Sequence, residues 1–348
     1  MALLKKEELQ KLFPTKGSAI VFILYMAMFV AQGMLVTMSR QGGKDYAYNP
    51  TTVVLLTETL KLVLSASSVV VQGGMGALVS GVRDNLRILA LYLIPSSLYC
   101  LYNNLSFVSL QYFNPTTYFM FMQIRLLLTG LIYQLLFKRQ LSRMQWFSLV
   151  LLTLGCVIHA AGLGKSNSSS VEGAGAGSYW GTILQLGPGH ALIVLQVLCS
   201  VFAGVYNEYI IKGDASDVDI MIQNVFMYLD SMLCNLLLLG AKNEIRTALT
   251  SASLASVTGS SLVILLIFNN AILGIVTSLF LKQLNSVVKA FASALELVFT
   301  ALLSVPLLGI ALTGQTVVAI FIISLAVLTY AKHPIKQQPS PQPTKQPV

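Results

Sequence analysis

Apolar residues fill runs of about twenty positions that recur along almost the whole chain and are separated by short polar breaks. A helix of this length crosses the hydrocarbon core of a bilayer, and only helices and closed barrels satisfy their backbone groups in lipid. The pattern therefore predicts an all-α integral membrane protein. Its ten expected spans lie at about 18–38, 51–72, 88–109, 114–137, 144–163, 188–211, 219–240, 261–281, 286–307 and 312–331.

The composition excludes an ordinary soluble domain. Of 348 residues, 55% are hydrophobic and only 10% are charged, whereas soluble proteins average about 25% charged residues. The first apolar run is followed by further spans without an Ala-x-Ala-like cleavage site, which favours a retained helix over a removed signal peptide. The four cysteines fall within spans and lack metal-ligand spacing, so we expect no metal or cofactor.

Lysine and arginine are unevenly shared between alternate loops. The loops on the side of the N-terminal arm (1–17) carry fourteen of them, and the loops on the other side carry five. The positive-inside rule then places both termini in the cytosol. The proline-rich stretch 333–348 is expected to form an extended cytosolic tail. No basic stretch has the interleaved aromatics that nucleic-acid binding needs, so the net charge of +9 reflects membrane topology.

The chain divides into two groups of five expected spans, 18–163 and 188–332, joined by a Gly- and Ser-rich lumenal linker at 164–187. The linker contains a glycosylation sequon at Asn167. A shift of 171 residues lays 110–161 on 281–332 with largely coincident polar positions. Because each half has an odd number of spans, the halves have opposite orientations, which predicts two inverted five-helix repeats. Chance similarity between two apolar hairpins is the alternative.

Arg125 lies in the middle of the fourth expected span. A charged side chain there costs between about 2.5 and 17 kcal/mol, so such a residue is usually functional. Tyr118, Met122, Arg125 and Thr129 fall on one stripe of a continuous helix, and we expect this stripe to line a water-filled cavity in which Arg125 binds an anion. Under the internal shift, the stripe falls on Lys289, Ser293, Glu296 and Thr300.

Lys289 is the second candidate cation for phosphate, because a guanidinium and an ammonium both bind phosphate oxygens. Asparagines precede both helices, Asn114 and Asn285, and capped positive helix ends would add to the field. The alternative is that each cation pairs with a buried carboxylate from Glu208, Asp230 or Glu296. Lys282 either meets the anion at the cytosolic mouth or acts as an ordinary flanking anchor.

Two spans combine aromatic and amide side chains on one face. Tyr99, Tyr102 and Asn103 do so in the third expected span, and Asn224 and Tyr228 do so in the seventh. A ring and an amide offer a pyrimidine base a stacking plane with paired donor and acceptor groups. Interhelical hydrogen bonds would explain the same residues equally well.

Glu58 and Lys61 are i, i+3 neighbours in the second span and are expected to form an internal ion pair. The alternative role for Lys61 is as a gate or as a contact to phosphate. Asp230 and Glu296 are further candidates for intramembrane ion pairs. No nucleophile–base pair or carboxylate dyad occurs, so the sequence does not predict an enzyme.

Several segments together resemble the nucleotide-sugar transporters of the solute carrier 35 family. They are Tyr102-Asn103-Asn104, Arg125, Arg139 to Trp146, Phe202 to Glu208, Asn224 to Tyr228 and Leu284 to Lys289. The resemblance covers about residues 17–332 and supports nucleotide contacts at the aromatic and amide positions. It also adds Thr277 and Ser278. Two positions depart from the family pattern: Arg125, where CMP- and UDP-sugar members often have lysine, and Asp230, whose carboxylate would repel phosphate unless protonated or paired.

The resemblance implies an alternating-access antiporter. It would exchange a cytosolic pyrimidine nucleotide sugar, a UDP-sugar in preference to a CMP-sugar, for a lumenal nucleoside monophosphate across the Golgi membrane. The endoplasmic reticulum is the alternative location, and a homo-oligomer or a complex with glycosyltransferases is an expected form. Three rivals remain: a carrier of another phosphorylated anion, a non-transporting scaffold for glycosyltransferases, and a membrane-embedded transferase.

Overall fold

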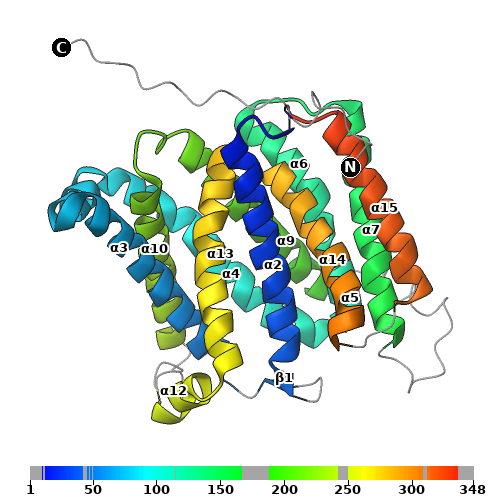
Figure 1. Ribbon diagram of the computed structural model, residues 1–348, viewed down its shortest axis with the longest axis horizontal. Helices are drawn as coiled ribbons and strands as arrows, with labels where there is room; N and C mark the ends of the chain where they lie inside the picture. Colours follow the sequence, from blue (N-terminus) through cyan, green and yellow to red (C-terminus); the bar gives the residue numbers. More distant parts are fainter. Residues whose placement is uncertain are drawn as a thin grey trace. The chain divides into compact units, whose positions relative to one another are not determined.

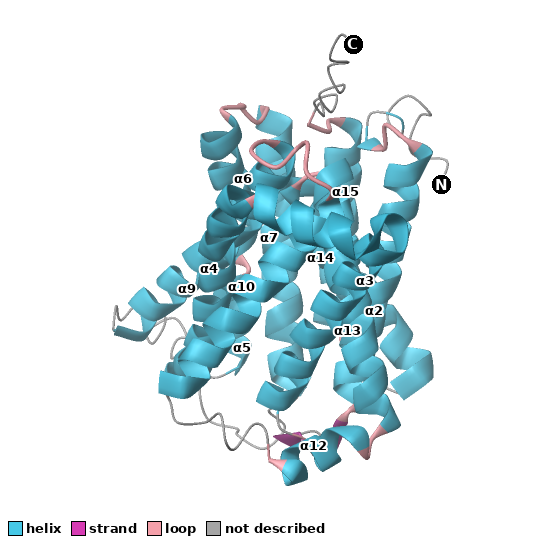
Figure 2. Ribbon diagram, turned by 90° about the vertical axis from the view of Figure 1, so that its left-hand side faces the viewer, coloured by secondary structure: helices cyan, strands magenta, loops and turns pink. Residues whose placement is uncertain are grey.

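The computed structural model describes residues 10, 12–41, 45–46, 48, 50–113, 115–166, 188–241, 250–308 and 312–335. Within them the chain is helical apart from short connections and one small ribbon (Figure 2). The ribbon pairs β1 (Arg40–Gln41) with β2 (Asp45–Tyr46) in antiparallel register. The sequon at Asn167, the helix cap expected at Asn114 and the tail beyond residue 335 lie outside the described residues.

Ten helical segments in the described chain are long and apolar enough to cross a membrane, which confirms the expected all-α membrane fold. A short helix that the sequence did not predict, α12 (Ser251–Thr258), precedes the eighth segment. The fourth segment consists of two consecutive helices, α5 and α6. The spanning helices are α2 (Lys16–Met38), α3 (Pro50–Asp84), α4 (Leu86–Tyr112), α5 (Pro115–Met122), α6 (Ile124–Phe137), α7 (Arg143–Ser166), α9 (Pro188–Lys212), α10 (Ile220–Ala241), α13 (Ser261–Gln283), α14 (Ser286–Leu308) and α15 (Gly314–Lys332).

Local sequence explains where several helices begin. Pro50 and Pro188 occupy first helical positions, where a missing N–H costs nothing and the fixed φ suits a helix. The Thr313 hydroxyl accepts a hydrogen bond from Thr316 N–H at 3.2 Å and caps α15. Asn285 caps α14 in the same way, accepting from Val288 N–H at 2.9 Å.

Helix α3 is longer than the sequence pattern predicts. The expected cytosolic loop at 73–87 is mostly helical, because the chain bends at Gly74 (φ 78°) and resumes helical geometry as far as Asp84. Glycine adopts this positive φ without steric cost, and the non-helical Gly74 divides α3 into two helical segments that meet at a kink. Beyond it, Val82 packs against a buried cluster that contains Ile88 and Phe226, and this packing stabilises the extension.

The chain forms two compact units, which we describe separately. Unit 1 is built mainly from Leu101–Val205 and Ala290–Ile335. In it, α7 and α15 lie side by side (Figure 1), and α5 and α6 also pack on α7. Phe291 of α14 stacks on Tyr330 of α15 with ring centroids 4.2 Å apart.

Unit 2 is built mainly from Phe13–Cys100 and Tyr206–Lys289. Helix α3 packs on α10, and α13 packs on both α2 and α3. The Tyr25 and Phe280 rings join α2 to α13 at 4.7 Å between centroids. Tyr92 of α4, Ile210 of α9 and Phe226 of α10 belong to one buried cluster of this unit.

Three of the boundaries between the two units fall within helices rather than in loops. The boundaries follow Cys100 in α4, Val205 in α9 and Lys289 in α14. Each unit therefore combines helices from both halves of the sequence, 18–163 and 188–332.

Candidate functional site

Arg125 follows a local irregularity in the fourth span. The single continuous helix expected here is wrong in detail, because α5 ends at Met122 and α6 begins at Ile124. Gln123 N–H donates to the Met120 carbonyl, an i→i+3 hydrogen bond that tightens the chain into one turn of 3₁₀ geometry. Tyr118 is buried before this turn, and Arg125 is half-buried just after it.

Arg125 has no ion-pair partner in the described part of the chain, where no carboxylate oxygen lies within 4.0 Å of it. The Glu296 carboxylate of α14 is near enough to interact with it electrostatically, and it accepts a hydrogen bond from Thr300 at 2.9 Å. Thr129 turns its hydroxyl to the Arg125 carbonyl at 2.7 Å. The guanidinium donors thus remain available for an anionic ligand.

Tyr118 is held by a hydrogen-bond chain that sequence reasoning missed. The Gln196 amide of α9 donates to Tyr118 Oη at 2.7 Å and accepts from the Ser109 hydroxyl of α4 at 2.9 Å. Gln196 is fully buried. Because Tyr118 Oη accepts from Gln196, the tyrosine keeps its own proton to donate to another group. The sequence feature that could have revealed this chain is Gln196 itself, a polar amide in the middle of an apolar run.

Tyr102 lies near Tyr118, close enough for the two hydroxyl groups to interact electrostatically. The structure therefore brings Tyr102, Tyr118 and Arg125 into one region of unit 1. Asn103, the neighbouring amide on α4, is exposed. Tyr99 is half-buried and lies on the unit 2 side of the boundary in α4.

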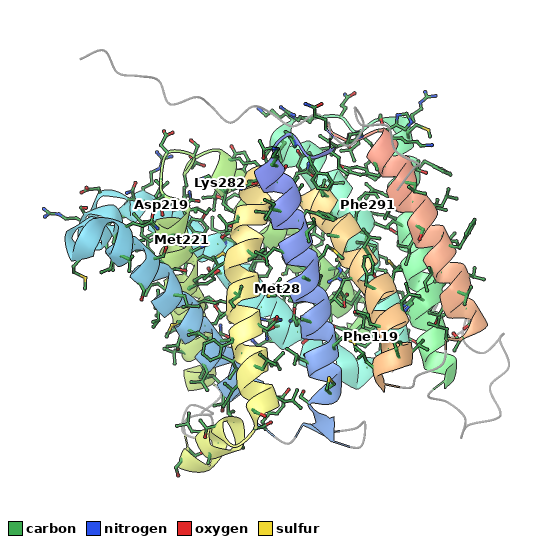
Figure 3. The ribbon with its side chains drawn as sticks, viewed as in Figure 1. Met28, Phe119, Asp219, Met221, Lys282 and Phe291 are labelled. Atoms are coloured by element: carbon green, nitrogen blue, oxygen red, sulfur yellow. The ribbon has the colours of Figure 1, made fainter. Side chains whose placement is uncertain are left out.

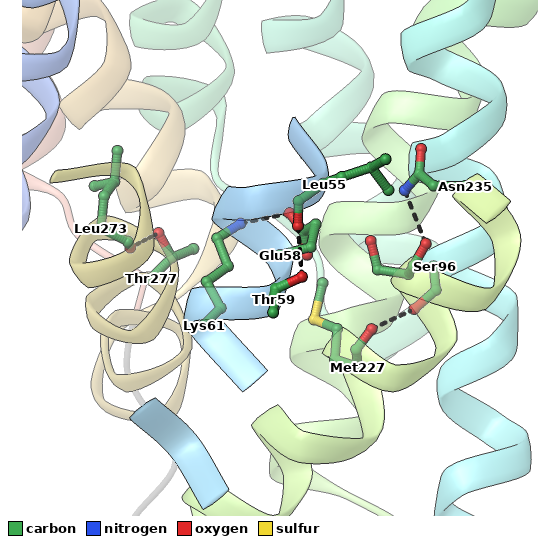
Figure 4. A network of polar contacts seen from close by, with 10 residues as sticks. Leu55, Glu58, Thr59, Lys61, Ser96, Met227, Asn235, Leu273 and Thr277 are labelled. Atoms are coloured by element: carbon green, nitrogen blue, oxygen red, sulfur yellow. Dashed lines mark hydrogen bonds and ion pairs between the residues drawn. The ribbon is translucent and has the colours of Figure 1, made fainter. Parts of the chain in front are cut away.

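In unit 2, the charged side chains of α3 neutralise each other. Lys61 Nζ lies 2.8 Å from Glu58 Oε1, at the i, i+3 spacing noted in the sequence. Figure 4 shows this pair on α3, together with Thr277 on α13 and Met227 on α10. Lys61 Nζ also lies 5.4 Å from the centroid of the Tyr228 ring, within cation–π range.

Gly274 of α13 makes this close packing feasible. A Cβ at this position would lie 2.7 Å from Lys61 Cε and 3.1 Å from Tyr228 Oη. A larger residue would therefore displace the lysine or the tyrosine. The contact unites α3, α10 and α13 around three side-chain groups: an anion, a cation and a phenol.

The remaining candidates of unit 2 bond mainly within their own helices. The Thr277 hydroxyl donates to the Leu273 carbonyl at 2.7 Å, and the Ser278 hydroxyl donates to the Ile275 carbonyl at 2.8 Å. The buried Asn224 amide contacts Met221 Sδ at 3.8 Å. These hydroxyl oxygens retain acceptor capacity, while their protons are already engaged.

Asp230 of α10 is buried, and its Oδ2 has no hydrogen-bond partner among the described residues. No cation there lies within ion-pair distance of it. The sequence raised Asp230 as a member of an ion pair, and the structure does not place such a partner beside it. Burying a carboxylate without a hydrogen-bonded cation is energetically costly.

The two lysines at the α13–α14 turn differ in their surroundings. Lys282 is exposed in the last turn of α13, at the same end of unit 2 as Asp219 (Figure 3). Lys289 is half-buried in the first turn of α14, where its N–H donates to the Asn285 carbonyl at 3.0 Å. Glu208, one of the carboxylates considered as a partner for Lys289, forms its ion pair with Lys212 at 2.7 Å.

Ten apolar helices that carry cations, carboxylates and amides within their spans are characteristic of membrane transporters for polar solutes. A model of the nucleotide-sugar transporter family matches residues 15–331. The chain therefore belongs to the nucleotide-sugar transporter family, and the resemblance found in its motifs is confirmed.

Similar proteins extend over nearly the whole chain. The UDP-galactose transporter senju of Drosophila melanogaster is 40% identical, over 94% of this chain and 89% of its own length. CMP-sialic acid transporter 1 of Oryza sativa subsp. japonica is 28% identical, over 89% and 93%. A protein of known crystal structure matches 91% of this chain and 96% of its own with a TM-score of 0.61 at 14% identity, which shows a similar fold.

Proposed function

We propose that this protein is an antiporter that exchanges a cytosolic UDP-sugar for lumenal UMP by alternating access. UDP-galactose is the first substrate to test, because the 40% identical relative carries that name. A single site that binds either ligand in turn accounts for exchange without an ion gradient or ATP. In this proposal the protein is a carrier, not an enzyme.

The observation that carries the proposal is the Arg125 guanidinium. It lies within a membrane span, no carboxylate among the described residues pairs with it, and Tyr118 nearby retains a proton to donate. A guanidinium binds two phosphate oxygens in a bidentate manner, and a phenol can donate to a third. Burying such a cation is costly unless an opposite charge compensates it, and binding of an anionic substrate would supply that charge.

We assign the phosphates of the substrate to Arg125 and Lys289, with Lys282 at the cytosolic entrance. The base is assigned to the aromatic and amide side chains that remain. These are Tyr99, Tyr102, Asn103, Tyr118, Asn224, Tyr228, Thr277 and Ser278. The Glu58–Lys61 pair, which contacts Tyr228, is available to respond to a ligand there.

Two helix pairings support the proposal that the halves are inverted repeats. Helices α7 and α15 are the fifth and tenth spans, and they pack together within unit 1. Helices α3 and α10 are the second and seventh spans, and they pack together within unit 2. Counterparts five spans apart meet in this way when they flank a pseudo-two-fold axis, as in transporters that rock one repeat against the other. The proposed setting is the Golgi membrane, with both termini in the cytosol.

The experiment is exchange in proteoliposomes. Vesicles that contain the purified full-length chain are loaded with UMP, CMP, GMP or buffer and given labelled UDP-galactose outside. We expect uptake to be fastest with internal UMP and the label to remain UDP-galactose. Equal uptake with and without internal nucleotide would refute antiport. Stimulation by an internal sugar phosphate alone would favour a carrier of another anion, free galactose or a galactosylated product would favour a transferase, and no uptake under any condition would favour a scaffold.

A further inference from the structure

Glu208 connects the end of α9 to the start of α14. Its carboxylate is fully buried. Oε2 accepts hydrogen bonds from both the backbone N–H and the hydroxyl of Ser286, each at 2.6 Å. Oε1 accepts from Lys212 Nζ at 2.7 Å. Each oxygen of this carboxylate therefore has a partner.

Lys212 completes the connection on the other side of the same turn. Its ammonium also donates to the carbonyl of Leu284, the residue that follows α13. A cation thus meets the carbonyl end of α13, while the Glu208 carboxylate meets the amide end of α14. Each charge has the sign that the facing helix terminus favours. We refer to Glu208, Lys212, Leu284 and Ser286 as the Glu208 network.

The Glu208 network holds the turn from which Lys289 projects. Asn285, between Leu284 and Ser286, caps α14 by accepting from Val288 N–H, and its carbonyl accepts from Lys289 N–H. Lys289 is therefore part of the first turn of α14, whose N-terminus is fixed by Glu208. A shift of this turn would move the lysine with it.

These contacts are suited to a permanent joint rather than to a gate that opens in every cycle. Separating the partners would leave a buried carboxylate and its ammonium without compensation, which is unfavourable in a membrane protein interior. Joined, the ends of α9, α13 and α14 move together.

We propose that Glu208 is a positioning residue for Lys289: the Glu208 network fixes the α13–α14 turn to α9 and so presents the lysine to the phosphate of the substrate. This inference rests on the proposed function, because it assumes that Lys289 contacts phosphate. It gives Glu208 a role in affinity in addition to folding.

The test compares nucleotide with nucleoside. Purified Glu208→Gln, Lys289→Met, the double variant and the wild type are assayed for binding of UMP and of uridine, and for the KM of exchange. Glutamine is nearly isosteric but turns an N–H₂ group toward Lys212 or Ser286, so the network loosens. We expect the Kd for UMP to rise about tenfold in either single variant and little further in the double variant, with the Kd for uridine unchanged. Asp217→Asn, an exposed carboxylate close to the same end of α9, is the matched control and should bind as the wild type does.

A milder variant covers the case in which Glu208→Gln does not fold. Ser286→Ala removes one hydrogen bond to Glu208 and leaves the backbone N–H bond, and we expect it to raise the Kd for UMP two- to fivefold. The inference is overturned if Glu208→Gln or Ser286→Ala lowers thermal stability but leaves the Kd for UMP unchanged. It is also overturned if Lys289→Met binds UMP normally, or if Glu208→Gln raises turnover at constant KM, which would indicate a gate. Failure of the wild type to exchange UMP for UDP-galactose would instead refute the proposed function.

Discussion

The ion pairs of unit 2 and the Arg125 region of unit 1 compensate charge within the membrane in different ways. In unit 2, Glu58 pairs with Lys61 on α3 and Glu208 pairs with Lys212 on α9, each at 2.7–2.8 Å within one helix. In unit 1, Arg125 and Glu296 come from different helices and interact without forming an ion pair.

This difference separates two meanings of a charge in an apolar span. A cation that has a carboxylate three or four residues away along the same helix is neutralised locally and contributes to structure. A cation without such a neighbour must be compensated from elsewhere. Arg125 is of the second kind, and in the proposed function the ligand provides the compensation. The following changes test this contrast, starting with the largest expected effect.

Removing the charge at position 125 should abolish most exchange. Charge-assisted hydrogen bonds are worth about 1.5–3 kcal/mol, so Arg125→Met should raise the KM for UDP-galactose about 10- to 100-fold. Arg125→Lys keeps the charge but loses the bidentate geometry and should have an intermediate effect. The measurement is exchange against internal UMP, with Lys138→Met, an exposed cation at the end of α6, as the control. If Arg125→Met has the KM of the wild type, the substrate does not compensate the charge of Arg125.

Breaking the chain that orients Tyr118 should have a smaller effect on affinity. Tyr118→Phe and Gln196→Leu should each raise the Kd for UMP about three- to tenfold, since one hydrogen bond is worth about 0.5–1.5 kcal/mol. The double variant should be little worse than either single variant, because both remove the same interaction. Binding is measured by calorimetry. Additive effects would show that Gln196 acts independently of Tyr118.

The α3 ion pair should affect stability most when only one partner is removed. Lys61→Met leaves the Glu58 carboxylate mostly buried without its cation, and should lower the free energy of unfolding by about 1–2 kcal/mol. Glu58→Gln combined with Lys61→Met removes both charges and should recover most of that loss. Unfolding midpoints without ligand make the comparison. If the double variant is less stable than Lys61→Met, the pair does not act by mutual neutralisation.

The smallest effect is expected at the exposed pair of unit 2. Arg87 Nη2 lies 3.8 Å from Asp214 Oδ1, and the arginine side chain is 83% exposed. Exposed pairs are screened by water and salt, so Arg87→Ala should change the free energy of unfolding by less than about 0.5 kcal/mol. The same unfolding assay applies, and a loss above about 1 kcal/mol would mean that exposure does not distinguish this pair from the buried ones.

Part of the candidate site follows from local spacing and part does not. The Glu58–Lys61 spacing, the Asn285 cap and the isolation of Arg125 along its own helix are visible in the sequence. The sequence also suggested one uninterrupted stripe from Tyr118 to Thr129, and here the 3₁₀ turn at Gln123 intervenes. That turn is a small change in backbone hydrogen bonding, and the periodicity of apolar residues does not predict it.

Contacts between distant segments could not be predicted from the sequence pattern. Gln196 reads only as one polar residue in α9, and its role depends on Ser109 and Tyr118 reaching it from two other helices. In the sequence, Glu208 was one of three carboxylates that could pair with Arg125 or Lys289, and the structure joins it to Ser286 and Lys212 instead.

By itself the sequence determined the ten membrane spans, the family and the Glu58–Lys61 ion pair within one helix. These depend on composition and on the 3.6-residue repeat, which the chain carries locally. Only the tertiary structure decided which charges remain without an ion-pair partner among the described residues, which amide orients Tyr118 and what Glu208 holds. The physical reason is that lipid-facing and protein-facing sides of a membrane helix are both apolar, so hydrophobicity places a helix in the bilayer without selecting the faces that meet.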